Sequence, residues 1–382
     1  MPEPIKVAIC DDIRQFDGDR LRDRSWSARF PGTSWVTSLH ERAGESGVEV
    51  ASGDVALNRV LSGEWRASDV HVVQELDARH GRALCALGAR PAVLTMLESP
   101  LVAFRQCDRM HRRIAPFAWC IGPESAFSRM RGLARSRILP LRFPCAWRAE
   151  VVEALAAPPS IEERSRAVLV AAQKRFAPTL RSQCRDLKSA LRALRHVVRR
   201  RLSPTSRALM PMQLHDERLA LMSALGARGL LDVWGPGWDR LDSIPRHLRS
   251  LLDPLRGRIL GPCPDKRAVL RRYRFAIAFE NTALKGYITE KLIDAIVAGC
   301  VPVYRGAPDA QRAVPTEAFV DCGTVGGAAA TAELVATMGD CEARRIVEAG
   351  RCFLASPAAD LHSYEGFGDW IVGLIRDQRS GS

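Results

Sequence analysis

Residues 273–308 read YRFAIAFENTALKGYITEKLIDAIVAGCVPVYRGAP, and this stretch decides the fold. The apolar run 275–279 is long enough for one buried strand, and 301–304 is a second such run. Between them, Thr289 stands at an N-cap position before an apolar-periodic segment that stops at Gly299. A strand, a helix and a second strand at this spacing form a βαβ unit, which predicts a parallel sheet.

Polar side chains gather where the first of these strands ends and where the helix begins. They are Glu280, Asn281, Tyr287, Glu290 and Lys291. Open α/β sheets bind ligands beyond the carboxyl ends of their strands, and the N–H groups and partial positive charge of a helix start suit a phosphate. A lysine in the first turn opposes the helix dipole by roughly 0.3–1 kcal/mol when exposed, and a bound anion would remove that conflict. The alternative is a solvated Lys291 that pairs with Glu290 or Asp294.

The motifs FAIAFENT, GYITEK and AGCVPVYRGAP within residues 273–308 closely resemble the signature of family 10 glycosyltransferases, the α-1,3/1,4-fucosyltransferases. The resemblance implies that this segment holds GDP-fucose. It makes Asn281, Tyr287, Glu290 and Lys291 donor-site residues. Lys291 would meet the pyrophosphate, and Glu290 would lie near the ribose or the developing sugar cation.

The chain has 382 residues, of which 47% are apolar and 26% charged, as expected of a globular protein with two domains. Pro158 and Pro159, followed by Ser and charged residues, form a linker signal. We therefore predict an N-terminal domain at 1–157, a second domain at 158–356 and a helical tail at 357–382. The resemblance implies an α/β protein of the GT-B class, with two Rossmann-like domains facing a cleft, the acceptor mainly on the first and the donor on the second.

The N-terminal half carries its own series of apolar runs. The predicted strands are 6–10, 48–51, 69–74, 92–97, 117–121 and 138–143. Residues 14–50 show no clean periodicity. Asp11 and Asp12 follow the first strand, where paired acids cap or turn more often than they bind metal.

The run AVLTML ends in Glu98-Ser99-Pro100. A carboxylate at the carboxyl end of a parallel strand lies on the ligand side of the sheet, and Pro100 holds Glu98 off any helix. A solvated or capping Glu98 is the alternative. The resemblance puts this turn in the acceptor domain, so we assign Glu98 and Glu290 as the catalytic residues, with Glu98 as the general base. Asp11, Asp12 or Glu75 would be the next candidates for the base.

Arginines and a lysine in the second half offer further donor contacts. The predicted strand 167–172 is followed by Lys174 and Arg175, and the resemblance places such a cluster near the donor phosphates. Arg218 lies in a predicted helix, 216–225, and matches the family's pyrophosphate-clamping arginine, with Arg175 as the alternative. A planar guanidinium suits bidentate phosphate binding.

With these cations and the helix start to meet the leaving-group charge, we expect no metal and no cofactor. One DxD match exists, at Asp17-Gly18-Asp19, far from the donor motif, and we interpret it as a turn.

The most basic stretch is 181–209, in a chain of formal charge +13. Leu187, Leu191, Leu194 and Val198 recur there at helical spacing among lysines and arginines. Such a helix can lie on an anionic membrane through residues 185–202, or its leucine stripe can pack on the donor domain; the sequence favours neither.

Eleven scattered cysteines without a CxxC pair indicate buried free thiols in a reducing cytosol. The N-terminus MPEPIKVAICDD has no signal-peptide h-region, so we predict a cytoplasmic protein of the bacterial type, peripheral on the inner membrane surface if the basic helix binds lipid.

The predicted reaction is inverting, metal-independent transfer of L-fucose from GDP-β-L-fucose to a glycan hydroxyl, on an oligosaccharide or lipopolysaccharide chain. Another GDP-sugar as donor is one alternative. A nucleic-acid-binding protein is another, but the basic stretch lacks interleaved aromatics and a reading motif, so we expect no nucleic-acid partner. The acceptor and the linkage stay open.

Overall fold

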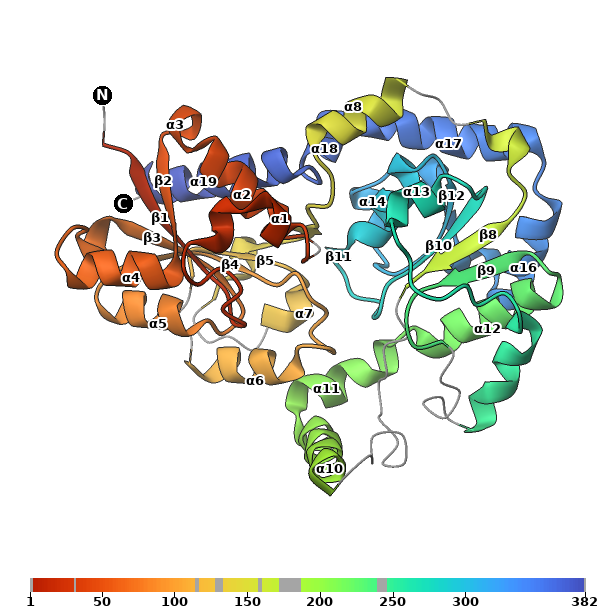
Figure 1. Cartoon of the computed structure of the whole chain (residues 1–382), viewed down its shortest axis with the longest axis horizontal. Coiled ribbons are helices and arrows are strands. Elements are labelled where there is room, and N and C mark those ends of the chain that lie inside the picture. Colours follow the sequence, from red (N-terminus) through yellow and green to blue (C-terminus); the bar gives the residue numbers. More distant parts are fainter. Residues whose placement is uncertain are drawn as a thin grey trace. The chain divides into compact units, whose positions relative to one another are not determined.

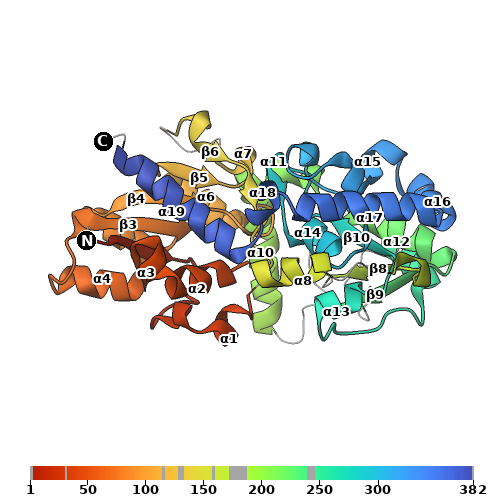
Figure 2. The same cartoon turned by 90° about the horizontal axis from the view of Figure 1, so that it is seen from above.

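The computed structural model describes residues 3–30, 32–113, 117–127, 133–156, 160–171, 187–238 and 246–380. The chain divides into two compact units (Figures 1 and 2). The first unit comprises Met1–Glu150, Leu284–Glu290 and Pro357–Ser382, and the second comprises Val151–Ala283 and Lys291–Ser356. Pro158 and Pro159, on which the domain boundary was predicted, lie outside the described residues.

The first unit is built on a six-stranded parallel sheet in the order β2-β1-β3-β4-β5-β6. Its strands are β1 Ile5–Cys10, β2 Val48–Ser52, β3 Val70–Glu75, β4 Arg90–Thr95, β5 Trp119–Ile121 and β6 Ile138–Leu139. These confirm the predicted strands except 138–143, which is two short strands, because Leu141–Arg142 pairs outside this sheet. The central strands are buried on both faces, which is why they appear in the sequence as continuous rather than alternating runs.

Helices flank this sheet, with α2 and α19 over one face and α4 and α5 over the other (Figure 1). The helices of the unit are α1 Arg24–Ser27, α2 Ser34–Glu41, α3 Ala43–Ser46, α4 Gly53–Leu61, α5 Arg79–Ala86, α6 Phe104–Arg113, α7 Glu124–Phe127, α18 Pro357–Asp360 and α19 Tyr364–Ser380. Helix α8, Arg148–Ala156, crosses the boundary between the units. The stretch 14–50 forms α1, α2 and α3, and Asp17-Gly18-Asp19 is a turn, as predicted.

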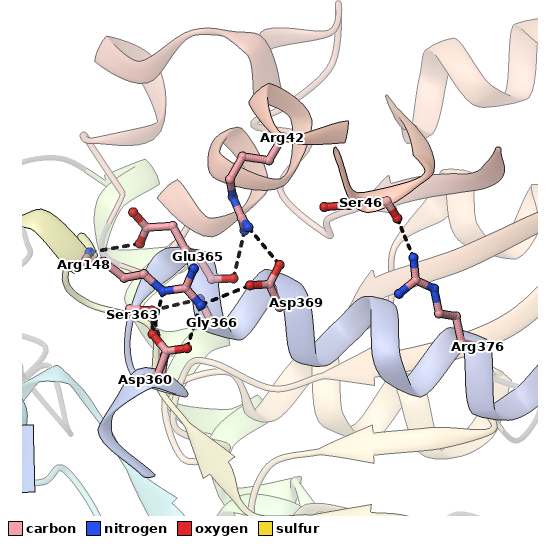
Figure 3. A network of polar contacts seen from close by, with 9 residues as sticks. All are labelled: Arg42, Ser46, Arg148, Asp360, Ser363, Glu365, Gly366, Asp369 and Arg376. Atoms are coloured by element: carbon pink, nitrogen blue, oxygen red, sulfur yellow. Dashed lines mark hydrogen bonds and ion pairs between the residues drawn. The ribbon is translucent and has the colours of Figure 1, made fainter. Parts of the chain in front are cut away.

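The C-terminal segment belongs to the first unit, where α19 lies beside α2 (Figure 2). Phe367, Ile371 and Ile375 on α19 are fully buried. Polar contacts also join this C-terminal segment to earlier parts of the first unit (Figure 3). Its contacts join Arg148 Nε to Asp360 Oδ1 at 2.8 Å, Arg42 Nη1 to Asp369 Oδ1 at 2.9 Å, and Arg376 Nη2 to the Ser46 carbonyl at 2.6 Å.

The second unit is built on a five-stranded parallel sheet in the order β13-β12-β10-β8-β9. Its strands are β8 Ala167–Val170, β9 Leu231–Trp234, β10 Phe275–Phe279, β12 Val301–Arg305 and β13 Val320–Asp321. Phe275 pairs with Val301 and Phe279 with Arg305, so β10 and β12 end at the same edge. The predicted βαβ unit is therefore confirmed.

Alternation along β10 explains how both faces of this sheet are covered. Phe275 and Ile277 pack with residues of α12 and α16, whereas Ala276 packs with residues of α13 and α14. The helices of the unit are α10 Leu187–Leu202, α11 Pro204–Leu209, α12 His215–Ala227, α13 Lys266–Leu270, α14 Glu290–Val297, α15 Cys322–Val325, α16 Ala328–Thr337 and α17 Asp340–Leu354. Gly299 ends the α14 segment at a φ of 66°, which suits glycine, and confirms the predicted stop.

Ten of the eleven cysteines lie in the described part of the chain, and all ten are free. Most are buried or half-buried, as predicted, although Cys341 and Cys352 are exposed. No helix of the described residues is both long enough and apolar enough to cross a membrane.

Candidate functional site

The carboxyl edge of the second unit's sheet carries two buried polar residues directly after β10. Glu280 and Asn281 are 1% and 5% exposed. The Glu280 N–H donates to the Arg305 carbonyl at 2.8 Å, which extends the β10–β12 pairing past the strand end. The prediction that polar groups gather at this edge is confirmed for Glu280 and Asn281.

Lys291 in the first turn of α14 pairs with Glu280. Its Nζ lies 3.1 Å from Glu280 Oε2, and the Glu280 side chain has no exposed surface. A buried carboxylate requires a compensating charge, and Lys291 provides one. Asp294, a predicted alternative partner of Lys291, instead lies 2.6 Å from Lys266 and 3.3 Å from Arg267.

Tight packing around Glu280 explains the YRGAP sequence after β12. A Cβ at Gly306 would overlap Tyr304 Oη and lie 2.5 Å from Glu280 Cγ, so only glycine fits there. Tyr304 Oη accepts the Ala307 N–H at 2.9 Å. Burial, together with the negative charge of Glu280, raises the pKa of Tyr304 well above its usual value and keeps the phenol neutral.

The first turn of α12 is joined to the loop that follows β10. Leu214 N–H donates to the Asn281 carbonyl at 3.2 Å, and Gln213 forms a bridge with Thr282. Arg218, one turn into α12, is therefore held beside the same edge as Asn281. Its role as a pyrophosphate clamp stays a prediction.

Arg218 is a buried cation without a carboxylate partner among the residues that the structure describes. Its side chain is 3% exposed, Nη2 lies 2.9 Å from His215 Nδ1, and Nε has no hydrogen-bond partner. Its guanidinium carbon lies 5.9 Å from the Trp238 ring centroid. Desolvation by burial lowers the pKa of Arg218 to about 10. A desolvated cation with an unpartnered Nε is a candidate site for an anion.

Another buried arginine of the same unit shows the usual arrangement. Arg274, just before β10, is 8% exposed, and its Nη1 lies 2.7 Å from Asp340 Oδ1. Its Nη2 donates to the Met338 carbonyl at 3.0 Å. The Nε atoms of both arginines lack a partner, so the difference between them is that Arg274 has a carboxylate partner and Arg218 has none among the described residues.

In the first unit, Glu98 lies shortly after β4 in a turn that Ser99 and Pro100 continue to α6. It is half-buried, and its Oε1 accepts the Ser99 N–H at 3.0 Å. The predicted position, beyond the carboxyl end of a parallel strand and off any helix, is confirmed.

Three further carboxylates follow the neighbouring strands at this edge. Asp11 and Asp12 follow β1, and Glu75 ends β3. Desolvation, with the negative charges of Asp12, Asp11 and Glu98, raises the pKa of Glu75 to about 8. Asp11 accepts the N–H groups of Gln15 at 2.9 Å and Phe16 at 3.2 Å, which confirms its turn-forming role.

Glu75 is tied to the residue before Glu98. Its carboxylate accepts the Leu97 N–H. Leu76, the next residue along, adopts a left-handed backbone with φ 51°, and its N–H donates to the Thr95 carbonyl at 3.2 Å. Such a conformation is uncommon for leucine and recurs at functional sites.

In the described part of the chain, no group of three or more His, Cys, Asp or Glu is arranged to hold a metal.

Tyr287 lies in the first unit, although the motif that contains it continues into the second. It forms the short strand β11, Tyr287–Ile288, which pairs in parallel with β7, Leu141–Arg142. Its side chain is 1% exposed and its hydroxyl donates to the Leu97 carbonyl at 3.4 Å. Tyr287 thus contacts the same peptide segment as Glu75, next to Glu98.

The structure therefore groups the predicted site residues in two sets. Arg218, Asn281 and Lys291 belong to the second unit, and Glu98, Tyr287 and Glu290 to the first. Lys174 and Arg175 lie outside the described residues. The sequence did not predict the pairing of Glu280 with Lys291 or the contact of Glu75 with Leu97. The one feature of the sequence that pointed to these contacts is the position of Glu280 and Glu75 at strand ends.

Residues 215–343 match the family model described as glycosyltransferase family 10 (fucosyltransferase) C-term. The chain is 39% identical over 71 residues to an alpha-(1,4)-fucosyltransferase of Arabidopsis thaliana, which covers 19% of this chain and 18% of that protein. It is 36% identical over 104 residues to alpha-(1,3)-fucosyltransferase 4 of Bos taurus, which covers 24% and 26%. An alpha-(1,3)-fucosyltransferase of Helicobacter pylori is 39% identical over 57 residues, 15% of this chain and 12% of that protein. The chain thus aligns with only a minor part of each of these relatives.

Two solved structures show the fold. The alpha,alpha-trehalose 6-phosphate synthase of Burkholderia multivorans is similar with a TM-score of 0.54 at 12% identity over 99% of both chains. Anabaena HepE in complex with UDP is similar with a TM-score of 0.52 at 11% identity over 99% of this chain and 100% of that one. The chain therefore has the GT-B fold. Within it, residues 215–343 belong to glycosyltransferase family 10, the fucosyltransferases.

Proposed function

We propose that the chain transfers L-fucose from GDP-β-L-fucose to a hydroxyl of a glycan, with inversion at the anomeric carbon. The observation that carries this proposal is Arg218, a buried cation inside the segment that matches family 10, with no carboxylate partner among the described residues. The fucosyltransferase names of the aligned relatives support the choice of donor.

Arg218 and Lys291 bind the donor diphosphate in this proposal. The Arg218 guanidinium offers several N–H donors, and Lys291 offers a point charge at the start of α14. Asn281 hydrogen-bonds the nucleoside portion, and Glu290 faces the ribose or the sugar cation. Lys174 and Arg175 supply additional positive charge near the phosphates. These cations neutralise the leaving GDP, so the proposed reaction uses neither a metal nor a cofactor.

Glu98 is the proposed general base. It accepts the proton of the acceptor hydroxyl as that oxygen attacks the anomeric carbon. The bond from the anomeric carbon to the β-phosphate oxygen breaks, and its electron pair leaves with GDP. Glu75 and Tyr287 both contact Leu97, the residue before Glu98, and in this proposal they help to position the turn that carries the base.

A donor screen tests the proposal. We expect GDP-fucose to raise the thermal midpoint of the purified chain more than GDP-mannose or UDP-glucose does, and to release GDP in the presence of a suitable glycan. A larger effect of GDP-mannose would favour the alternative of another GDP-sugar. A larger effect of UDP-glucose would overturn the assignment.

The acceptor is an oligosaccharide or a lipopolysaccharide chain in this proposal, and the protein acts in the cytoplasm. The alternative of a nucleic-acid-binding protein predicts salt-dependent oligonucleotide binding that GDP does not affect. That alternative would be excluded if the chain did not bind oligonucleotides, or if GDP-fucose competed with oligonucleotide binding.

A further inference from the structure

Helix α10, Leu187–Leu202, precedes α11 in the second unit and packs mainly on it (Figure 1). One face of α10 is turned toward its own unit. His196, Val197 and Arg200 on this face are half-buried. Arg200 Nη2 lies 3.1 Å from Met210 Sδ, and burial lowers the pKa of Arg200. The inward face of α10 is thus already occupied.

The opposite face exposes an apolar stripe. Leu194, Val198 and Leu202 are 44%, 45% and 70% exposed, and their spacing of four places them in one row along the helix. The sequence continues this spacing at Leu187 and Leu191. Of the two alternatives left open by the sequence, packing of the stripe on the donor domain is not favoured by the exposure of Leu194 and Val198.

Exposed arginines flank this stripe on both sides. At about 100° per residue, Arg195 and Arg199 lie about 60° and 100° from the centre of the stripe on one side, and Arg201 lies about 60° away on the other. The sequence of α10, LKSALRALRHVVRRRL, contains no acidic residue. A row of apolar side chains between two rows of cations is typical of a helix that lies in the interface of an anionic bilayer.

We propose that α10 docks in the plane of an anionic membrane, with Leu194, Val198 and Leu202 in the acyl boundary and Arg195, Arg199 and Arg201 on the lipid phosphates. This inference does not rest on the proposed transferase activity. A nucleic acid would satisfy the arginines but would leave the apolar stripe in water. An anionic lipid surface can bury the apolar row in its acyl region and pair both arginine rows with its phosphates.

Vesicle sedimentation of the full chain tests the proposal with two triple variants. One replaces Leu194, Val198 and Leu202 with Ser, and the other replaces Arg195, Arg199 and Arg201 with Gln. The matched control replaces Leu61 and Val152 with Ser, because these residues are 66% and 65% exposed but lie on other helices. Phosphatidylcholine vesicles with and without phosphatidylglycerol are the probes.

We expect the wild-type chain and the control to bind only vesicles that contain phosphatidylglycerol, and to dissociate as salt rises. The arginine triple should bind on the order of a hundred-fold more weakly, and the leucine-valine triple should also lose most of its binding. All four proteins should bind GDP equally. Unchanged binding of the leucine-valine triple would overturn the proposal, as would wild-type binding to neither kind of vesicle.

Two other occupants of the stripe give distinct results in the same experiment. If the stripe packs on the rest of the chain, the leucine-valine triple will have a lower unfolding midpoint than the control. If the stripe contacts a second copy of the chain, the leucine-valine triple will differ from the wild type in oligomeric state, as measured by size-exclusion chromatography. Either result without vesicle binding contradicts the membrane assignment.

Discussion

Lys291 Nζ lies 3.1 Å from Glu280 Oε2, and that carboxylate is fully buried. The pair resolves the conflict between a lysine and the positive end of α14, because Glu280 supplies the negative charge that the dipole favours there. The ammonium is consequently held at the edge where the proposed diphosphate binds. Glu280 and Lys291 are therefore best tested together.

We expect Lys291→Met to lose a charge-assisted phosphate contact worth roughly 1.5–3 kcal/mol. GDP should then bind about ten- to a hundred-fold more weakly in calorimetry. The same change removes the Lys291 charge from the buried Glu280 carboxylate, so the variant should also be less stable to urea. Glu280→Gln alone should leave GDP binding intact.

The double variant Glu280→Gln/Lys291→Met separates the two effects. It removes both charges, so the urea midpoint should recover toward that of the wild type while GDP binding stays weak. Wild-type GDP affinity in the double variant would show that Lys291 only compensates Glu280 and does not contact the donor.

Arg218→Met should weaken GDP binding about ten- to a hundred-fold without loss of stability, because it removes a desolvated cation that has no carboxylate partner among the described residues. Arg274→Met is the matched control. It breaks the pair with Asp340, so it should lower the urea midpoint and leave GDP affinity unchanged. Equal GDP affinity in Arg218→Met and the wild type would rule Arg218 out as a phosphate ligand.

The pH dependence of stability should report on Glu75. Its pKa is raised from 4.5 to about 8, so the folded chain keeps a proton that the unfolded chain has released in this interval. The stability linked to this carboxyl is complete below the unfolded pKa and is lost as pH rises through the folded pKa. Glu75→Gln should lack this loss, since the amide is neutral throughout.

Urea unfolding of Glu75→Gln and the wild type at acidic and mildly alkaline pH measures the difference. We expect Glu75→Gln to gain stability relative to the wild type as the pH rises. The pKa values of Asp11 and Asp12 are also raised, mainly by burial, but both residues are present in both proteins and largely cancel. A difference that does not change with pH would contradict the raised pKa.

The sheets were predictable because their strands are buried on both faces and so appear as continuous apolar runs. The run 275–279 predicted β10 in full, and the polar residues Glu280 and Asn281 lie at the carboxyl edge of the sheet, as predicted. Local pattern also located Gly299. By contrast, α1 and α3 have four residues each, too few to show helical periodicity.

Contacts between distant segments were not predictable. Tyr287 belongs to the donor motif in sequence, but the two-residue strand β11 pairs with β7, far earlier in the chain. Glu75 and Leu97 come together only because β3 and β4 are neighbours in the sheet. Periodicity in α10 identified the face formed by Leu194 and Val198 but not whether that face was covered, because coverage depends on the surrounding fold.

Replacement of Glu98 by Gln is the decisive test of the chemistry. A sugar hydroxyl is a weak nucleophile at neutral pH, and proton removal during attack contributes about 10²–10⁴-fold. Glu98→Gln keeps the size of the side chain and can still accept the Ser99 N–H, but it cannot take up the proton. Turnover should fall roughly a hundred-fold or more, with GDP-fucose affinity nearly unchanged.

Glu75→Gln is the control that separates the base from its neighbour. Near neutral pH Glu75 is mostly protonated, and Gln imitates that neutral form, so its turnover should stay within a few-fold of the wild type. Steady-state kinetics with GDP-fucose and a glycan acceptor measure both variants. If Glu75→Gln loses turnover and Glu98→Gln keeps it, the base is Glu75, and Glu98 is a turn residue. If both variants keep it, the proton goes to Asp11 or Asp12, the remaining carboxylates that follow β1 at this edge.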